Sequence, residues 1–281
     1  MGIALALVAA VAWSALDALR KRLAVALDPA ALAVVLTLGY VPIFAVWMAL
    51  DGGWYRDPSY FWIVGLNGVI NAVAGILFLW ALRLSPLGVT IPLLALTPAL
   101  TAMVAGPLLG EWPTRVGAIG IAAVVVGAFA LAREGPKERL RLAPGSLLMA
   151  LVAVLWAVAG PLDKLALGVA DVSFHAACLA LVAGGLLAAG LALRGRVGEI
   201  RGVSRDLRGV VAALVVVALA QAIQFVAFTQ VQVSVVETIK RAVGMIMAVA
   251  LGRIFFGEVV TTRKVAAIVA MLAGTALLIH G

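Results

Sequence analysis

The segment LLGEWPT at residues 108–114 returns as FFGEVVT at residues 255–261. The Gly-Glu pairs of the two segments lie 147 residues apart, and the same separation relates Gly127 to Gly274. An internal match that keeps one separation over several positions indicates a duplicated unit. We therefore expect two related halves, and this expectation determines the fold that we predict.

A second pair of matching segments lies near the start of each half. WSALDALRK at 13–21 and WAVAGPLDK at 156–164 both place a lysine eight residues after a tryptophan. These segments are 143 residues apart. Matches that keep the same order in both halves support the duplication.

The composition is that of a membrane protein. Of 281 residues, 65% are hydrophobic and 12% are charged, and the mean hydropathy is +1.17. Soluble domains carry about 25% charged residues. The net charge of +8 comes mainly from basic residues between apolar runs, which is typical of cytoplasmic connections and argues against nucleic-acid binding. The one cysteine, Cys178, excludes an intrachain disulfide.

Ten apolar runs are long enough to cross a bilayer, which takes roughly 20 helical residues. They are 2–19, 30–50, 60–82, 86–110, 113–132, 146–165, 172–193, 208–229, 232–256 and 263–280. Five helices per half is an odd number, so the second half must cross the membrane in the opposite sense to the first. We predict an all-α polytopic membrane protein with ten transmembrane helices in two inverted five-helix repeats, an architecture typical of secondary transporters.

Two long segments carry a resemblance to a known family. ALRLSPLGVTIPLLALTPALTAMVAGPLLGEWPTRVGAIGIAAVVVGA at 81–128 resembles the EamA domain of the drug/metabolite transporter (DMT) superfamily, and VSVVETIKRAVGMIMAVALGRIFFGE at 233–258 is similar to its partner copy. The likeness covers nearly the whole chain. It implies a carrier of small metabolites whose central cavity is lined mainly by helices 1, 3, 4, 6, 8 and 9. The predicted repeats are 1–133 and 146–281, joined by a loop at 134–145.

The fifth apolar run contains three glycines at helical spacing. Gly117, Gly120 and Gly127 are three and seven residues apart. Small residues on one face let two membrane helices approach closely. We predict that this face packs against another helix.

Polar side chains inside membrane spans are costly, so each is a candidate site residue. Asn67 and Asn71 lie four residues apart on the third helix, and Gln221 and Gln224 lie three apart on the eighth. We expect both pairs to face a shared wet cavity, although interhelical hydrogen bonds that only hold the bundle together are an open alternative. The predicted substrate-binding residues are Lys240, Arg241, Glu237, Asn71, Asn67, Gln224, Gln221 and Asp17.

The segment VETIKRAVG at 236–244 places three charges inside the ninth apolar run. Glu237 lies three residues before Lys240 and four before Arg241, so the side chains can meet on one helix face. One positive charge is left over. We interpret it as part of a clamp for a substrate carboxylate, and we leave open a structural ion network that includes acidic residues of other helices.

The other polar residues of the spans are predicted to gate the transporter or to support its structure. Lys21 and Lys164 end the first helix of each half and are expected near the membrane interfaces. Thr97 can bond carbonyls that Pro98 leaves without a donor. His175 is expected to be hydrogen-bonded within the bundle, with proton transfer as the alternative. The predicted gating or structural residues are Lys21, Asp163, Lys164, His175, Thr97 and Pro98.

The sequence contains no enzymatic motif that we recognise. His175 and His280 have no spacing suited to a metal pair, and we find no nucleophile elbow or phosphate-binding Gly-Lys loop. We predict a transporter without a metal or cofactor, with proton or ion coupling left open. Its predicted function is export of a small metabolite, an amino acid or organic anion, by alternating access. The alternatives are efflux of cationic drugs or amines through Glu237, Asp17 or Asp163, and a non-transport receptor or assembly factor.

The distribution of basic residues predicts the orientation in the plasma (inner) membrane. Connections after helices 1, 3, 5, 7 and 9 carry 3, 1, 4, 5 and 2 Lys or Arg, 15 in all, and the opposite side carries Arg56, Arg115 and Lys164. By the positive-inside rule the odd-numbered connections are cytoplasmic, so both termini face the exterior or periplasm. The expected partners are a small solute and the lipid bilayer, and the expected assembly is a monomer or homodimer.

A pair of C-terminal fusions tests this orientation. If the C-terminus is external, an alkaline phosphatase fusion is active and a green fluorescent protein fusion is dark, because phosphatase folds outside the cytoplasm and the fluorescent protein folds inside it. Bright fluorescence without phosphatase activity would overturn the assignment.

Overall fold

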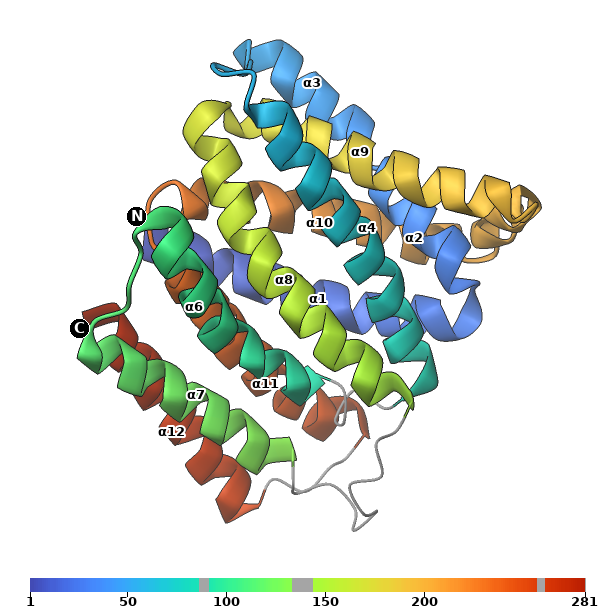
Figure 1. Cartoon of the computed structure of the whole chain (residues 1–281). Coiled ribbons are helices and arrows are strands. Elements are labelled where there is room, and N and C mark those ends of the chain that lie inside the picture. The colour runs from blue at the N-terminus through green and yellow to red at the C-terminus, as the bar shows by residue number, and fades with distance from the viewer. Residues whose placement is uncertain (86–90, 133–143, 257–260, 281) are drawn as a thin grey trace.

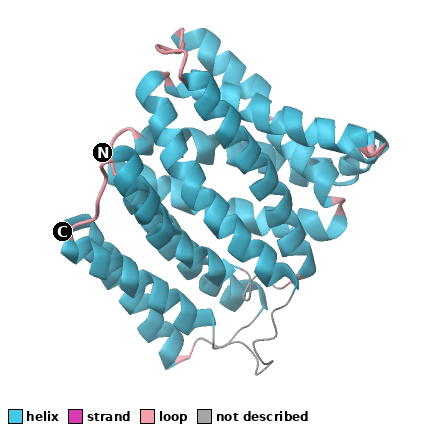
Figure 2. Ribbon diagram, in the orientation of Figure 1, coloured by secondary structure: helices cyan, strands magenta, loops and turns pink. Residues whose placement is uncertain are grey.

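The computed structural model describes residues 1–85, 91–132, 144–256 and 261–280. Within them the chain is helical apart from turns and one isolated bridge between Tyr55 and Ala170 (Figure 2), which confirms the all-α expectation. The elements are α1 (Gly2–Ala26), α2 (Pro29–Leu38), α3 (Val41–Asp51), α4 (Tyr60–Leu84), η1 (Ile91–Leu96), α6 (Thr97–Leu109), α7 (Arg115–Ala132), α8 (Pro144–Val169), α9 (Val172–Leu193), η2 (Val197–Asp206), α10 (Leu207–Phe228), α11 (Val233–Phe256) and α12 (Thr262–His280).

The first helix is longer than predicted. We expected it to end at residue 19, before three basic residues, but α1 continues to Ala26. The Lys21 ammonium donates to the carbonyl oxygen of Leu82 and, at 3.0 Å, to that of Ser85. These carbonyls end α4 and lack helical donors, so the charge is satisfied inside the bundle and the helix does not have to end before it.

The second predicted span, 30–50, is divided into α2 and α3. The break falls at Gly39 and Tyr40, and Pro42 stands in the first turn of α3. Proline has no backbone N–H and is tolerated in the first turn of a helix, where that donor would have no partner. The two helices together still form one apolar segment from Pro29 to Asp51.

The fourth predicted span, 86–110, is also not one regular helix. Residues 86–90 lie outside the described chain, Ile91–Leu96 forms the 3₁₀ turns of η1, and α6 begins with Pro98 in its first turn. The hydroxyl oxygens of Thr97 and Thr101 are buried and have no hydrogen-bond partner within the described chain. Our expectation that Thr97 bonds a carbonyl freed by the proline is therefore wrong.

Two predicted features of the second half lie outside the described residues. The structure does not describe the Gly-Glu pair at 257–258 or most of the connecting loop at 134–145. The first Gly-Glu pair is described, and Gly110 ends α6 in the left-handed conformation with φ of 71°. A residue with a Cβ atom is strained in this conformation, which explains the glycine.

Corresponding helices of the two halves exchange partners across the bundle. α1 of the first half packs along α10 of the second, and α8 of the second packs along α4 of the first. α6 packs on α11, and α7 packs on α12 as an outer pair (Figure 1). This reciprocal pattern is what two related halves produce when they pack against each other.

The α7–α12 contact depends on glycine. A Cβ atom on Gly120 would lie 2.4 Å from the carbonyl oxygen of Gly274, and a Cβ atom on Gly127 would lie 3.0 Å from that of Ala267. With the separation of 147 residues, Gly120 corresponds to Ala267 and Gly127 to Gly274, so the two close contacts are equivalent. The predicted close approach along this glycine face is confirmed.

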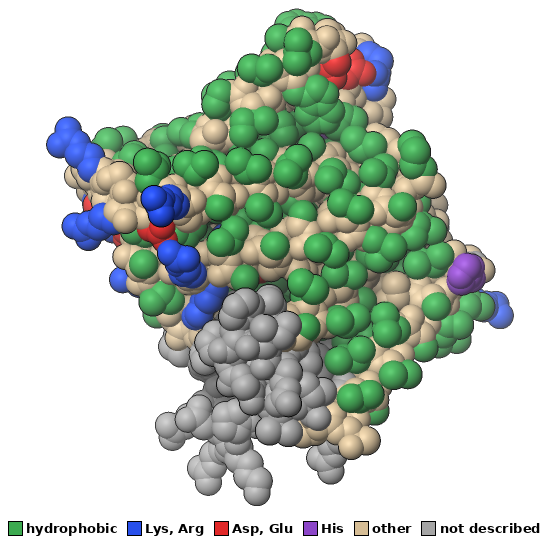
Figure 3. All heavy atoms as spheres, turned by 180° about the vertical axis from the view of Figure 1, so that it is seen from behind, with side chains coloured by type: hydrophobic (Ala, Val, Ile, Leu, Met, Phe, Trp, Pro, Cys, Tyr) green, Lys and Arg blue, Asp and Glu red, His purple; other side chains and the backbone are tan. Residues whose placement is uncertain are grey.

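The outer surface of the bundle is apolar. Side chains such as Val211, Val215 and Leu219 recur every four residues along α10 and are 48%, 49% and 55% exposed. Hydrophobic side chains cover much of the face seen in Figure 3. Among the described residues, six helical segments are long and apolar enough to cross a membrane, and three shorter apolar helices accompany them. The chain is a multi-pass membrane protein.

Substitution of Gly120 by alanine tests the α7–α12 packing. Gly120→Ala is expected to destabilise the protein by about 1–3 kcal/mol, because the added methyl group overlaps backbone atoms of α12. Gly65→Ala is the control, since a Cβ atom there has nothing within 4 Å. Thermal melting in detergent should show a lower midpoint only for Gly120→Ala, and equal midpoints for the two variants would contradict the close approach.

Candidate functional site

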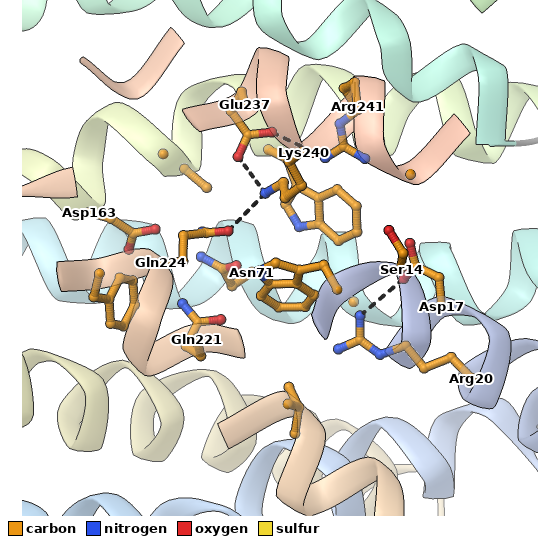
Figure 4. A pocket seen from close by; sticks show the side chains of 18 of the residues that line it. Ser14, Asp17, Arg20, Asn71, Asp163, Gln221, Gln224, Glu237, Lys240 and Arg241 are labelled. Atoms are coloured by element: carbon orange, nitrogen blue, oxygen red, sulfur yellow. Dashed lines mark hydrogen bonds and ion pairs between the residues drawn. The ribbon is translucent and has the colours of Figure 1, made fainter. Parts of the chain in front are cut away.

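A cavity of about 170 Å³ lies between the two halves (Figure 4). Residues of α1, α4, η1, α8, α10 and α11 line it, with further contributions from α2 and α9. The first six elements correspond to the predicted helices 1, 3, 4, 6, 8 and 9, so the helix set implied by the resemblance is present. Both halves contribute to the walls, and a ligand in the cavity would contact both.

Glu237, Lys240 and Arg241 meet on one face of α11. The Glu237 carboxylate forms an ion pair with Lys240 through Oε1, and its Oε2 lies 3.1 Å from Arg241 Nη2. The Glu237 residue is 3% exposed and the Arg241 residue 8%, so both charges lie inside the protein. Two cations share one carboxylate, and the predicted excess of positive charge stands at the cavity wall.

Two tryptophans, at equivalent positions in the two halves, face these cations. Lys240 Nζ lies 5.5 Å from the ring centroid of Trp13, and the Arg241 guanidinium carbon lies 5.9 Å from that of Trp156. Such contacts between a cation and an aromatic face are favourable, more so where water is scarce. From the sequence both tryptophans were recognised only as markers of the repeat and not as cavity residues. Their equivalent positions in the two halves could have indicated that both face the space between the halves.

The predicted amide residues divide between the cavity and the wall behind it. Asn71, Gln221 and Gln224 line the cavity, and Gln224 accepts a hydrogen bond of 3.0 Å from Lys240 Nζ. Asn67 is fully buried and donates to Asp163. It also accepts from Asn71 Nδ2 at 2.9 Å, so it supports the cavity side chains from behind.

Asp17 lies on α1 with Arg20 as its neighbour (Figure 4). The distance from Arg20 Nη1 to Asp17 Oδ1 is 3.9 Å, which is a loose ion pair. The sequence analysis placed Arg20 in a connection, but it lines the cavity because α1 continues past it. Three cations and three carboxylates therefore line the cavity: Arg20, Lys240 and Arg241, with Asp17, Asp163 and Glu237.

Asp163 lies in a buried hydrogen-bonded network that joins three helices. It accepts from Asn67 of α4 and lies 3.1 Å from His175 Nε2 of α9. The other imidazole nitrogen, Nδ1, lies 3.1 Å from the Tyr60 hydroxyl. His175 is fully buried and hydrogen-bonded, as predicted, and Asp163 contacts it instead of joining the Glu237 cluster.

Lys164 joins the two halves at one end of the bundle. It forms an ion pair with Glu111 and donates to the carbonyl oxygen of Val231 at 2.7 Å. Glu111 Oε2 also accepts from the Val233 amide at 3.0 Å, which caps the start of α11. One contact thus joins the end of α6 in the first half to α8 and α11 in the second. Sequence reasoning used Glu111 only as a repeat marker.

Lys21 takes the position in the first half that Lys164 takes in the second. Both ammonium groups donate to carbonyls just after the third helix of their own half, at Ser85 and Val231. Neither lysine ends its helix as expected, because α1 continues to Ala26 and α8 to Val169, and their gating or structural role stays a prediction. The remaining two predicted residues, Thr97 and Pro98, are buried at the start of α6 and do not line the cavity.

Comparison with known proteins identifies the family pattern. A family model described as the EamA-like transporter family matches residues 1–133 and 143–280. One solved structure, described only as the crystal structure of a protein, is similar over 99% of this chain and 98% of its own, with a TM-score of 0.77 and 20% identity. At that identity the likeness bears on the fold alone. No curated protein matches the chain by sequence.

A double-mutant cycle tests the Glu111–Lys164 contact. Glu111→Gln or Lys164→Met alone leaves one partly buried charge without its partner, whereas the double variant removes both charges. We expect a coupling energy of about 1–2 kcal/mol in detergent unfolding. Arg56 and Asp171 provide the control, because this 2.6 Å ion pair is half exposed and should couple by less than about 1 kcal/mol. Additive effects of Glu111→Gln and Lys164→Met would contradict the contact.

Proposed function

Since the chain belongs to the EamA-like transporter family, we propose that it exports a small metabolite bearing a carboxylate, such as an amino acid, by alternating access. The family consists of transporters, so the chain is a membrane transporter and not an enzyme. The observation that carries the substrate class is the charge at the cavity wall: Lys240 and Arg241 share the single carboxylate of Glu237.

Arg241 has unused capacity to bind an anion. Its Nε atom is buried and has no hydrogen-bond partner among the described residues, whereas its Nη2 atom is held by Glu237. A guanidinium group binds a carboxylate through two parallel N–H donors. In this proposal a substrate carboxylate accepts a hydrogen bond from Arg241 Nε. It accepts another from Lys240 Nζ, which donates to Gln224 and Glu237 and has a third N–H. Gln221 and Asn71 then contact the polar parts of the side chain.

Efflux of a cation is less well supported by the contacts. It needs a carboxylate that can exchange its partner for the substrate, but Glu237 already has two cations on its own helix. Asp17, 3.9 Å from Arg20, is more loosely paired than Glu237 and would contact the amino group of a zwitterionic substrate. An amino acid would pair its carboxylate with the cations of the cavity and its amino group with Asp17, whereas a cationic drug would pair only with a carboxylate.

Alternating access between two inverted repeats, 1–133 and 146–281, is the mechanism that we propose. Two related halves that exchange equivalent packing partners can interconvert their conformations. The Glu111–Lys164 contact links the halves on the side of the even-numbered connections, and its breakage would open the cavity there. If the odd-numbered connections are cytoplasmic, as we propose, the even-numbered side is external. With the Glu111–Lys164 contact in place on the external side, the cavity would take up substrate from the cytoplasm.

Removal of the clamp charges tests the substrate class. Lys240→Met and Arg241→Met are expected to weaken binding of the preferred substrate by about 1.5–3 kcal/mol, the usual value of a hydrogen bond to a charged group. Uptake of a panel of radiolabelled L-amino acids into proteoliposomes and ligand-dependent melting measure the loss. Arg83→Met is the control, because Arg83 also lies over a tryptophan, Trp80, but is exposed at the end of α4.

The double variant Glu237→Gln with Lys240→Met separates a clamp from a structural network. It removes one charge of each sign from α11, so the protein should remain folded, with Arg241 as the one charge left of these three residues. A clamp predicts a stable protein with little uptake. Normal uptake by a stable double variant would remove these residues from the binding site.

Single cysteines test alternating access. Asn71→Cys and Gln224→Cys, each in a Cys178→Ser background, should change their rate of labelling by a membrane-impermeant maleimide when the transported amino acid saturates the protein. The change is expected because both positions line the cavity. Constant labelling rates would place the site elsewhere.

A further inference from the structure

We propose that Asp163 and His175 form the site that binds a coupling proton, so that transport of the carboxylate substrate is driven by proton movement. This inference rests on the proposed transport function. It is carried by the contacts of Asp163, by its exposure to the cavity and by its position between the two halves.

Asp163 differs from the other two cavity carboxylates in its partners. Glu237 has Lys240 and Arg241, and Asp17 has Arg20. In the described part of the chain, the side chains that contact Asp163 within hydrogen-bond distance are those of Asn67 and His175. A buried carboxylate without a cationic partner is costly, and binding a proton removes that cost.

The contacts of Asp163 and His175 are compatible with the following arrangement of protons. If the Tyr60 hydroxyl donates to His175 Nδ1, then Nδ1 is an acceptor and the remaining ring nitrogen, Nε2, carries the proton that is donated to Asp163. Asn67 Nδ2 donates to the same carboxylate oxygen, Oδ1. In this arrangement the imidazole is neutral and the Asp163 carboxylate is ionised. One further proton can bind, and Asp163 Oδ2 is free of these contacts.

The proton can reach this site through the substrate cavity. Asp163 lines the cavity, where its carboxylate is seen in Figure 4, whereas His175 is fully buried behind it. Asp163 also precedes Lys164, which forms the ion pair with Glu111 across the two halves. A change of charge at Asp163 therefore occurs next to the contact that must break when the cavity opens to the other side.

The network also joins the two halves. Asn67 and Tyr60 belong to α4 of the first half, and Asp163 and His175 belong to α8 and α9 of the second. Protonation of Asp163 removes the negative charge toward which Asn67 donates, so it weakens a contact across the interface that moves in alternating access. One proton would bind from one side and be released to the other in each cycle.

The other titratable groups near the site set its environment. Lys240 of α11 interacts with Asp163 through its charge, but the Glu237 carboxylate offsets that charge. Tyr60 of α4, Tyr40 between α2 and α3, and Cys178 of α9 are the remaining titratable neighbours of the network. These three groups are neutral at physiological pH in their ordinary state.

The imidazole of His175 can report the protonation directly. The chain has two histidines, so the variant His280→Gln, labelled with ¹⁵N-histidine in detergent micelles, gives ring signals from His175 alone. The signals are recorded from about pH 8 to about pH 5, and we expect them to shift when Asp163 takes up a proton, because its Oδ1 lies 3.1 Å from His175 Nε2. In Asp163→Asn this shift should be lost, because the carboxyl group that takes up the proton is gone.

Asp171→Asn is the matched control for this titration. It is the same substitution at an exposed carboxylate near the start of α9, where Asp171 pairs with Arg56 outside the network. It should leave the His175 titration unchanged. Asp163→Glu keeps a carboxyl group and should titrate with a displaced midpoint even if Asp163→Asn folds poorly. A His175 signal that does not change over this pH range, or one that is the same in Asp163→Asn, would overturn the proposal.

Transport assays separate this proposal from the proposed function. Proteoliposomes that contain the dye pyranine report internal pH while a mixture of the twenty L-amino acids is added. The wild type should move protons and amino acids together, and Asp163→Asn should exchange labelled amino acids without moving protons. Amino-acid movement by the wild type without proton movement would overturn the proton site alone. Failure of the wild type to move any amino acid would overturn the proposed substrate class, while the His175 titration would still decide whether the proton site exists.

Discussion

A charge inside a membrane helix must find its partner within the protein, and this constraint determines how the cavity is built. Glu237 lies between Lys240 and Arg241, and Asp17 faces Arg20. In a bilayer the alternative to these contacts is an unpaired charge in hydrocarbon, which is far less stable. The charged faces of α1 and α11 therefore turn toward each other, and the apolar faces of the outer helices turn toward lipid.

Ion pairs join the halves at both ends of the bundle. Glu111 and Lys164 join the halves at one end, and at the other end Asp28 lies 3.0 Å from Arg196. The first contact is largely buried and also caps α11, whereas the second includes side chains that are 22% and 35% exposed. Burial makes a paired charge harder to separate from its partner, so the Glu111–Lys164 contact is expected to be the harder of the two to break.

Much of the fold followed from patterns along the chain, and the departures have local causes. The repeated Gly-Glu and Trp-to-Lys segments predicted two halves, and the glycines of α7 predicted its close packing. Two of the predicted spans are divided, and in each a proline stands in the first turn of the helix that follows the break, Pro42 in α3 and Pro98 in α6. Proline has no backbone N–H and fits this position better than the interior of a helix. The length of α1 depended on a contact between Lys21 and the end of α4, and these residues are more than 60 positions apart. The candidate site was predicted through its charged and amide residues, but Trp13, Trp156, Arg20 and Glu111 were missed as members.

The sequence by itself determined that the chain is a helical membrane protein made of two related halves, because hydropathy, length and repetition are properties of residues in order. It also placed Glu237, Lys240 and Arg241 on one face of one helix, because their spacing matches the helical period. Only the tertiary structure decided which charges share a cavity and which lie behind its wall. Asp163 and Asn67 are 96 residues apart, and no local pattern records that α4 and α8 cross where these side chains meet.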